Sequence, residues 1–263
     1  AVIRDTTNWY HLVFKFDAAN TSAVWYINGQ EITDLNSSTD PSNQDFQVNA
    51  TTQHFLGRFG SSLGTSYFDG YMAEVNFVDG YAYDASYFGF TDSQTGIWMP
   101  RRYEEAYGTN GFRLDFLDNS SAAALGIDKS PNGNDFTVNN HSVSASLTND
   151  SMLDTPTNNF CILDHLNKTN SFTGKDGGLT FDQNSNDQAI TGSFFVTSGK
   201  WYWEFYKNSG HNPEIGISVV GRETLNNRST GFIEGRAAFI SNDGRIRTGS
   251  SSTADITGSS SGQ

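Results

Sequence analysis

Cysteine is almost absent from this sequence. Its 263 residues include one, Cys161, so no intrachain disulfide can form. A small extracellular module stapled by disulfides is therefore excluded. Cys161 lies in the apolar run Phe160–Leu163, and a thiol among apolar side chains is typical of a buried, inert cysteine rather than of a nucleophile.

Positive charge is also scarce, with 16 Lys and Arg residues against 29 Asp and Glu residues and a net charge of −13. A nucleic-acid-binding protein needs a basic surface to neutralise phosphates, so no nucleic-acid partner is expected. An anionic membrane surface is disfavoured for the same reason. The acidity either serves solubility, which is the commoner explanation, or supplies oxygen ligands for calcium.

Long apolar runs and helical patterns are missing as well. No run reaches the length of about 18 apolar residues that a transmembrane helix needs, and we expect neither membrane insertion nor a signal peptide. The chain begins at Ala1 within a strand-like pattern and ends in a Gly/Ser-rich tail, which leads us to expect a fragment of a longer protein. The best helical candidate, Tyr103–Ala106, spans barely one turn.

The pattern that the sequence does contain is that of β-strands. Aromatic residues make up 14% of the chain, there are 26 glycines, and Ser, Thr and Asn fill the gaps between short apolar runs. The clearest strand is predicted in Phe68–Gly80, where apolar residues recur at every second position and would share one face. These residues are Tyr71, Ala73, Val75 and Phe77. Further strands are predicted in Trp9–Phe16 and Ala23–Ile27, and the Asn28-Gly29 dipeptide indicates a type I′ hairpin turn.

A set of motifs in the first ninety residues resembles the C-terminal half of a laminin-G/concanavalin-A-like lectin domain. In chain order the motifs are Asn8–Leu12, Trp25–Gly29, Leu56-Gly57 and Phe68–Val75. The resemblance covers roughly residues 5–90 and implies consecutive strands of a two-sheet jelly roll. Half a jelly roll would expose its apolar face, so we expect upstream residues, another segment or another chain to complete it.

The last third resembles the opening strands of a SPRY domain, which is another two-sheet sandwich. The motifs are Ser198–Phe205 and Ile215–Ile217, within a resemblance over about residues 160–248. The fold class implied is all-β, with two antiparallel β-sandwich (jelly-roll) domains joined by an irregular linker. We expect residues 1–95 to form the incomplete lectin-like sandwich, 96–159 a connector with short strands, and 160–263 a SPRY-like sandwich that is incomplete at its C-terminal end.

This order of modules, with three distinctive linker phrases, looks like the virion proteins of phages, particularly marine and cyanobacterial phages. The phrases are Gly108–Phe112, Ile127–Asp135 and Asp154–Asn158. The resemblance implies a non-enzymatic tail-fibre or decoration protein on the virion surface. Its expected partners are a host-surface glycan or protein, other virion proteins and further copies of itself. The alternatives are a polysaccharide depolymerase on a jelly-roll scaffold and a cellular SPRY adaptor that binds peptides.

No cofactor is predicted, with calcium as the alternative. Asp128, Ser130 and Asn132 place oxygen atoms at alternate positions before Gly133, which is how a calcium loop begins. Asn139 stands where an EF-hand loop has its bidentate Glu, so that motif fails. Pro131-Asn132-Gly133 is equally a plain turn, and both interpretations stay open.

Catalytic residues are not predicted. The Glu-x-Asp-x-x-Glu motif of the laminarinase-type jelly-roll enzymes is missing, as is Gly-x-Ser-x-Gly, and Glu74 and Glu204 are expected to be solvated on outer faces. Aromatic rings that stack on sugars are candidate ligand contacts, although loop aromatics more often pack on their own domain. These candidates are Trp98 and Tyr103, with Tyr81 and Tyr83 beside them. The SPRY resemblance adds Arg222, Arg228 and Arg236 as anchors for an acidic glycan or a protein.

Overall fold

The computed structural model describes residues 3, 8–17, 19, 22–34, 48–59, 66–68, 70–143, 150–168, 172–175, 178–183, 190–206, 215–218, 237–240, 245–248 and 251–255. The chain divides into unit 1, Ala1–Phe160, and unit 2, Cys161–Gln263, and each is described by itself. Over the described residues the regular structure is strand, with short 3₁₀ turns and no α-helix, so the all-β prediction is confirmed there. No helix in this part of the chain is long and apolar enough to cross a membrane.

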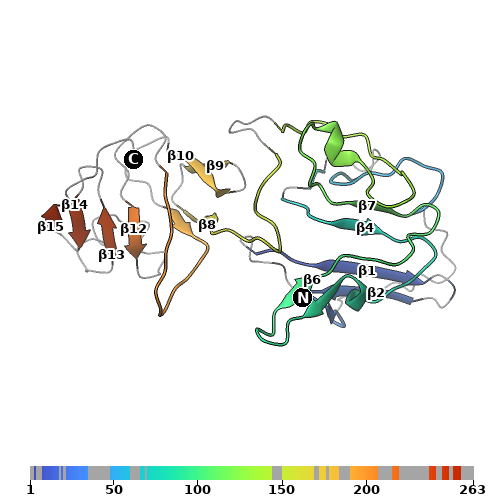
Figure 1. The fold of residues 1–263 in the computed structure, drawn as a ribbon, viewed down its shortest axis with the longest axis horizontal. Helices are drawn as coiled ribbons and strands as arrows, with labels where there is room; N and C mark the ends of the chain where they lie inside the picture. The colour runs from blue at the N-terminus through green and yellow to red at the C-terminus, as the bar shows by residue number, and fades with distance from the viewer. Residues whose placement is uncertain are drawn as a thin grey trace. The chain divides into compact units, whose positions relative to one another are not determined.

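Unit 1 begins with an antiparallel sheet of β1 (Leu12–Asp17), β2 (Ser22–Ile27) and β3 (Gln30–Glu31), in that order (Figure 1). The turn between β2 and β3 has φ angles of 49° at Asn28 and 76° at Gly29. A type I′ turn requires positive φ at both residues, so the predicted hairpin is confirmed.

The two faces of this sheet have different environments. Val13 is buried, and Lys15 and Tyr26 on the same face contact the loop before η1 (Ala85–Tyr87). On the opposite face Leu12, Phe14 and Trp25 are 53%, 50% and 43% exposed, and the rings of Phe14 and Trp25 lie 4.4 Å apart. This face of the sheet therefore presents large apolar side chains to solvent.

The strand predicted in Phe68–Gly80 forms over only part of its length. β4 is Val75–Phe77, and it pairs with β7, Phe112–Leu114 (Figure 1). Tyr71, which is expected on the core face, is 49% exposed. The extended backbone is interrupted at Glu74, where φ is 53°, and β7 offers a ladder of three residues, so the longer strand prediction is wrong.

The region predicted as a connector supplies strands and core to unit 1. β6 (Trp98–Pro100) pairs with β5 (Gly89–Thr91), and η2 (Ala123–Gly126) follows β7. The described core side chains of the unit are Val13, Ala85, Tyr103, Tyr107, Leu114, Ala124 and Leu125, of which the last five come from this region. Asp154 then accepts hydrogen bonds from the Trp9 indole at 2.9 Å and from the Phe160 backbone at 2.7 Å, which ties the end of the unit to its beginning.

Unit 2 consists of small antiparallel sheets in its described part (Figure 1). β8 (Leu163–Lys168) pairs with β11 (Ile190–Gly192), and β9 (Phe172–Lys175) pairs with β10 (Thr180–Gln183). A four-stranded sheet contains β12 (Ile215–Ser218), β13 (Ala237–Ile240), β14 (Arg245–Thr248) and β15 (Ser251–Asp255).

The strand expected in Ser198–Phe205 is not formed. Residues 194–206 pair with no strand among the residues that the structure describes, and Trp201, Tyr202 and Trp203 are 61%, 82% and 52% exposed. Glu204 is exposed, as expected, and accepts a hydrogen bond from the Tyr202 hydroxyl. An apolar period-two pattern becomes a strand only where a neighbouring strand takes its backbone hydrogen bonds.

Candidate functional site

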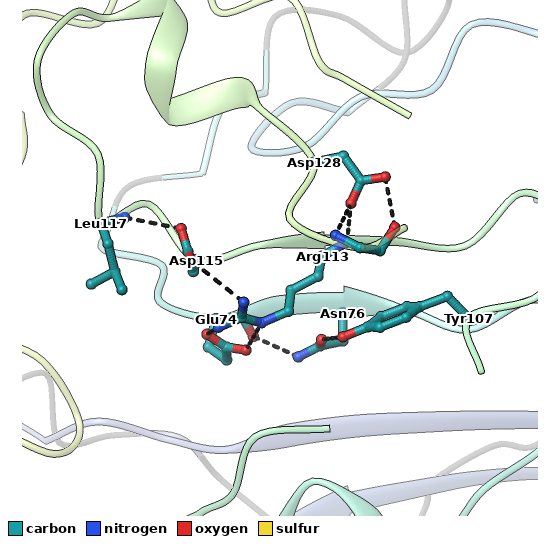
Figure 2. Close-up of polar contacts among 8 residues, drawn as sticks. Glu74, Asn76, Tyr107, Arg113, Asp115, Leu117 and Asp128 are labelled. Atoms are coloured by element: carbon teal, nitrogen blue, oxygen red, sulfur yellow. Dashed lines mark hydrogen bonds and ion pairs between the residues drawn. The ribbon is translucent and has the colours of Figure 1, made fainter. Parts of the chain in front are cut away.

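A buried polar network centres on Arg113 of β7 (Figure 2). The guanidinium donates through Nε and Nη2 to the two carboxylate oxygens of Glu74, at 2.5 and 2.9 Å, and Nη1 lies 3.4 Å from Asp115 Oδ2. The hydrogen bonds to Glu74 are the main cause of a raised pKa for Arg113. This bidentate geometry locks the residue before β4 to the centre of β7.

Glu74 therefore does not occupy the solvated outer face that its place in the alternation predicts. Its side chain is 30% exposed and its carboxylate is engaged by Arg113. Beside it, Asn76 donates to the Glu74 carbonyl at 3.4 Å and accepts from the Tyr107 hydroxyl at 2.8 Å (Figure 2). Burial raises the pKa of Tyr107 to about 12, which keeps the hydroxyl protonated as the donor. The network holds two strands together.

Asp128 organises the loop after η2. Its Oδ1 accepts from the backbone N–H groups of Arg113 and Ser130, and its Oδ2 accepts from the Ser130 hydroxyl and the Asn134 N–H, all at 2.8 Å. Burial, the largest single influence, opposes the charge, but these four hydrogen bonds together hold the pKa of Asp128 below its usual value. The carboxylate is thus a buried anion that is fully satisfied by internal donors.

The three calcium candidates all lie in this loop and all have protein partners. Besides its bond to Asp128, the Ser130 hydroxyl oxygen accepts from the Asn132 N–H at 3.2 Å. The Asn132 amide nitrogen donates to the carbonyls of Gly108 and Gly111, at 2.7 and 2.8 Å. Over the described residues no three His, Cys, Asp or Glu side chains are grouped to hold a metal. The geometry favours a structural turn, and calcium binding stays a prediction.

Trp98 of β6 lines an open groove in unit 1. The groove is lined by Ile27, Asn28 and residues 30–34 of the β2–β3 hairpin and by Thr91, Gly96 and Trp98, and it has a volume of about 590 Å³. This Trp98 groove combines an indole, side-chain amides, hydroxyls and the carboxylates of Glu31 and Asp34. These groups provide both a surface for stacking and hydrogen-bond partners for hydroxyl groups.

The indole of Trp98 is fixed by three contacts. Its Nε1 donates to His11 Nδ1 at 3.1 Å, and its ring lies so close to Gly29 and Gly89 that a Cβ at either position would come within 2.3 or 2.5 Å of ring carbons. Burial lowers the pKa of His11, which favours the neutral imidazole that can accept this bond. Trp98 is therefore a rigid wall of the groove.

A ladder of aromatic rings lies beside η1. Tyr83 stacks on Tyr81, with centroids 5.5 Å apart, and it makes tilted ring contacts with Tyr87 at 4.1 Å and with Tyr103 at 5.9 Å. Tyr103 is 2% exposed and its hydroxyl donates to the Ala106 carbonyl, so its ring supports the ladder from inside and cannot be reached by a ligand. Tyr81 and Tyr87 are 53% and 40% exposed. We call Tyr81, Tyr83 and Tyr87 the tyrosine platform.

The structure describes only some of the ligand contacts that the sequence predicts. Trp98 lines a groove, whereas Arg222, Arg228 and Arg236 lie outside the described residues and stay predictions. Glu31 and Asp34 were not predicted, although their position directly after the Asn28-Gly29 turn places them at one end of the sheet. Their signal in the sequence is this position, and no motif marks them.

The comparisons with known proteins agree with the first part of the chain. Residues 2–85 match the family model of the concanavalin A-like lectin/glucanases superfamily. No curated protein and no solved structure matches the chain. The match supports the lectin-like segment and a β-sandwich relationship for it, and the superfamily it identifies contains both lectins and glucanases.

Proposed function

We propose that this protein is a non-enzymatic adhesion protein of a phage virion, either in a tail fibre or as a surface decoration, and that unit 1 binds a host glycan in the Trp98 groove. The observation on which glycan binding depends is the position of the groove. Its residues 27–34 belong to the hairpin inside the segment that matches concanavalin A-like lectins and glucanases. The opposite wall comes from β5 and β6.

The chemistry of the groove favours a neutral sugar. Glu31 and Asp34 are exposed carboxylates that accept hydrogen bonds from sugar hydroxyls and repel a uronic acid or a sulfated sugar. The net charge of −13 acts in the same direction over the whole chain. An open groove buries only part of a ligand, so we expect weak binding at a single site, with a Kd of about 1 mM.

The virion assignment is supported by the order of lectin-like and SPRY-like segments and by the three linker phrases of the sequence. Two of these phrases meet in unit 1, where Asn134 donates to the carbonyls of Thr109 and Gly111 at 3.3 and 2.9 Å. We also propose that the protein forms homo-oligomers and that each half of the chain belongs to a jelly-roll sandwich. Phage capsid, portal or tail genes beside the reading frame would support the virion assignment, and their absence would contradict it.

Binding to immobilised polysaccharides tests the glycan site. Dextran, starch and mixed-linkage β-glucan serve as neutral probes, and pectate and alginate as acidic ones. We expect at least one neutral polymer to bind and both acidic ones to fail. Glu31→Ala and Asp34→Ala should each weaken binding about tenfold, since each removes a charged hydrogen-bond acceptor. Glu104→Ala, an exposed carboxylate outside the groove, is the matched control and should bind as the parent does.

Two results would contradict this function. If none of the neutral polymers binds, the groove has no glycan role and a scaffold function remains. If a bound polymer is cleaved, with release of reducing ends that a single substitution of Glu31 or Asp34 abolishes, the protein is a depolymerase. A glycosidase uses two carboxylates as acid and base or nucleophile, which is why this measurement separates binding from cleavage.

A further inference from the structure

The tyrosine platform is exposed on its outside and supported from within. Tyr81 and Tyr87 are 53% and 40% exposed, whereas Tyr103 is 2% exposed. The Tyr103 ring stacks on Phe88 at 5.1 Å and contacts Tyr107 edge to face at 4.9 Å. Rings that are held by neighbouring rings lose little conformational freedom when a ligand stacks on them. The platform is therefore preorganised for a ligand with a flat apolar face.

Two paths connect the platform with the Trp98 groove. Tyr26 of β2 lies directly opposite the groove residue Glu31 in the strand register, so the two side chains share a face of the sheet. The Tyr26 hydroxyl donates to Asp84 Oδ1 at 3.1 Å, and Asp84 is the residue before η1. Along the chain, Tyr87 and the groove residue Thr91 are four positions apart, which limits their Cα distance to about 14 Å.

A pair of charged groups joins β1 to the residue before η1. Lys15 Nζ contacts Asp84 Oδ1 at 2.7 Å, and the Asp84 side chain is 57% exposed. The hydrogen bond from Lys15 is the largest cause of the lowered pKa of Asp84, which keeps this carboxylate ionised at neutral pH. A sugar ring has a C–H face that stacks on aromatic rings and hydroxyls at its edge that bond to charged groups, and this surface offers both.

We propose that the tyrosine platform is a second subsite for the same glycan chain, so that the preferred ligand is an extended neutral polysaccharide rather than a single sugar. This inference depends on the proposed glycan binding in the Trp98 groove. A polysaccharide that occupies the groove presents its next sugar units to the tyrosine platform at a high effective concentration. The two weak contacts then add to the affinity of one polymer. The length of the polymer, and not only its sugar type, determines affinity.

The test compares a polymer with its own repeat unit on the full chain. The probe is the neutral polysaccharide that binds best among dextran, starch and mixed-linkage β-glucan, together with the matching disaccharide. The double variant Tyr81→Ala/Tyr87→Ala should bind the polymer about tenfold more weakly and the disaccharide as the parent does. Tyr67→Ala is the control, because Tyr67 is 63% exposed on the same unit and outside the platform.

The possible outcomes separate the two ideas. If the double variant binds the polymer as tightly as the parent, the second subsite is refuted while glycan binding in the groove stands. If the parent binds no neutral polymer, both ideas fail. Nitration of the parent by tetranitromethane gives a measurement that requires no substitution. Bound polymer should protect Tyr81 and Tyr87 and leave Tyr67 reactive, and equal reactivity of all three tyrosines would overturn the inference.

Discussion

Replacing Asp128 by Asn should destabilise unit 1, because the amide cannot serve all the donors that the carboxylate serves. Oδ1 accepts from two backbone N–H groups, and Oδ2 accepts from one hydroxyl and one backbone N–H. Asparagine keeps one oxygen and replaces the other by an NH₂ group. Whichever way the amide turns, two donors that pointed at oxygen then face a donor.

The size of the effect follows from these lost bonds. A hydrogen bond to a charged group contributes about 1.5–3 kcal/mol to stability, and a buried donor without a partner costs about 1–3 kcal/mol. Asp128 is 7% exposed, so water cannot easily replace the lost acceptor. Because the Ser130 hydroxyl can rotate to another partner, we expect a net loss of about 2–4 kcal/mol in the free energy of unfolding. That is a large part of the total stability of a typical domain.

Urea denaturation followed by tryptophan fluorescence, with hydrogen exchange of peptides from β7, measures this loss. Exchange at β7 should accelerate in the variant, since the Arg113 N–H is one of the four donors. The matched control is Asp118→Asn, whose exposed carboxylate accepts a local hydrogen bond from the Ser120 N–H, two residues along the chain. It should change exchange at β7 far less than Asp128→Asn does.

The pH dependence gives the sharper test. The pKa of Asp128 in the folded state is lower than the usual 3.8, so its contribution to stability is fully present above that value and is lost as the pH falls through the folded pKa. The difference between parent and Asp128→Asn should therefore be constant from pH 7 to about 5 and shrink below about 4. A loss under about 0.5 kcal/mol at pH 7, or a difference that stays unchanged at pH 3, would refute the reasoning.

Two further predictions concern Arg113 and His11. Arg113→Met leaves the Glu74 carboxylate without its partner and should lower the free energy of unfolding, measured by urea denaturation, by about 3 kcal/mol. The control, Lys15→Met, removes the exposed ion pair with Asp84 and should lower it by less than about 1 kcal/mol. Equal losses in the two variants would contradict the structural role of Arg113. The pKa of His11 is lowered by burial from 6.5, so stability is full above that pH and is lost as the pH falls toward the folded pKa. Protonation of His11 also removes the nitrogen that accepts the hydrogen bond from the Trp98 indole. Between pH 7.5 and 5 the Tm of the parent should therefore fall more than the Tm of His11→Asn. Identical pH profiles of Tm would show that His11 does not titrate in this range.

The parts of the fold that the sequence predicts are those that local chemistry determines. Asn28-Gly29 specifies positive φ at two successive residues, and the hairpin of β2 and β3 forms where it is predicted. Period-two patterns also predict β1, which contains Val13, and β12, which contains Ile215 and Ile217. Each of these strands pairs with another strand of the same unit. The absence of α-helix in the described residues follows from the lack of a helical period.

The strand predictions fail where the presence of a neighbouring strand decides whether a segment forms a ladder. Residues 71–74 have the same alternation as β4 but lie outside the three-residue ladder with β7. Trp201, Trp203 and Phe205 recur at every second position, yet they pair with no strand in the described part of unit 2. The role of Glu74 was missed for the same reason, because Arg113 is 39 positions away and no local pattern connects them. Periodicity describes a strand's faces and does not identify its neighbour.

The Trp98 groove is also formed by segments that are distant in the sequence. The groove needs the hairpin within residues 2–85 and also Trp98, which lies beyond that segment. Likewise β4 lies within the matched segment, whereas its partner β7 and most of the described core of unit 1 follow it. The segment that matches the concanavalin A-like model is therefore shorter than unit 1, Ala1–Phe160. The β4–β7 ladder and the Trp98 groove both include residues from 96–160, and the three linker phrases lie in the same unit as the proposed binding site.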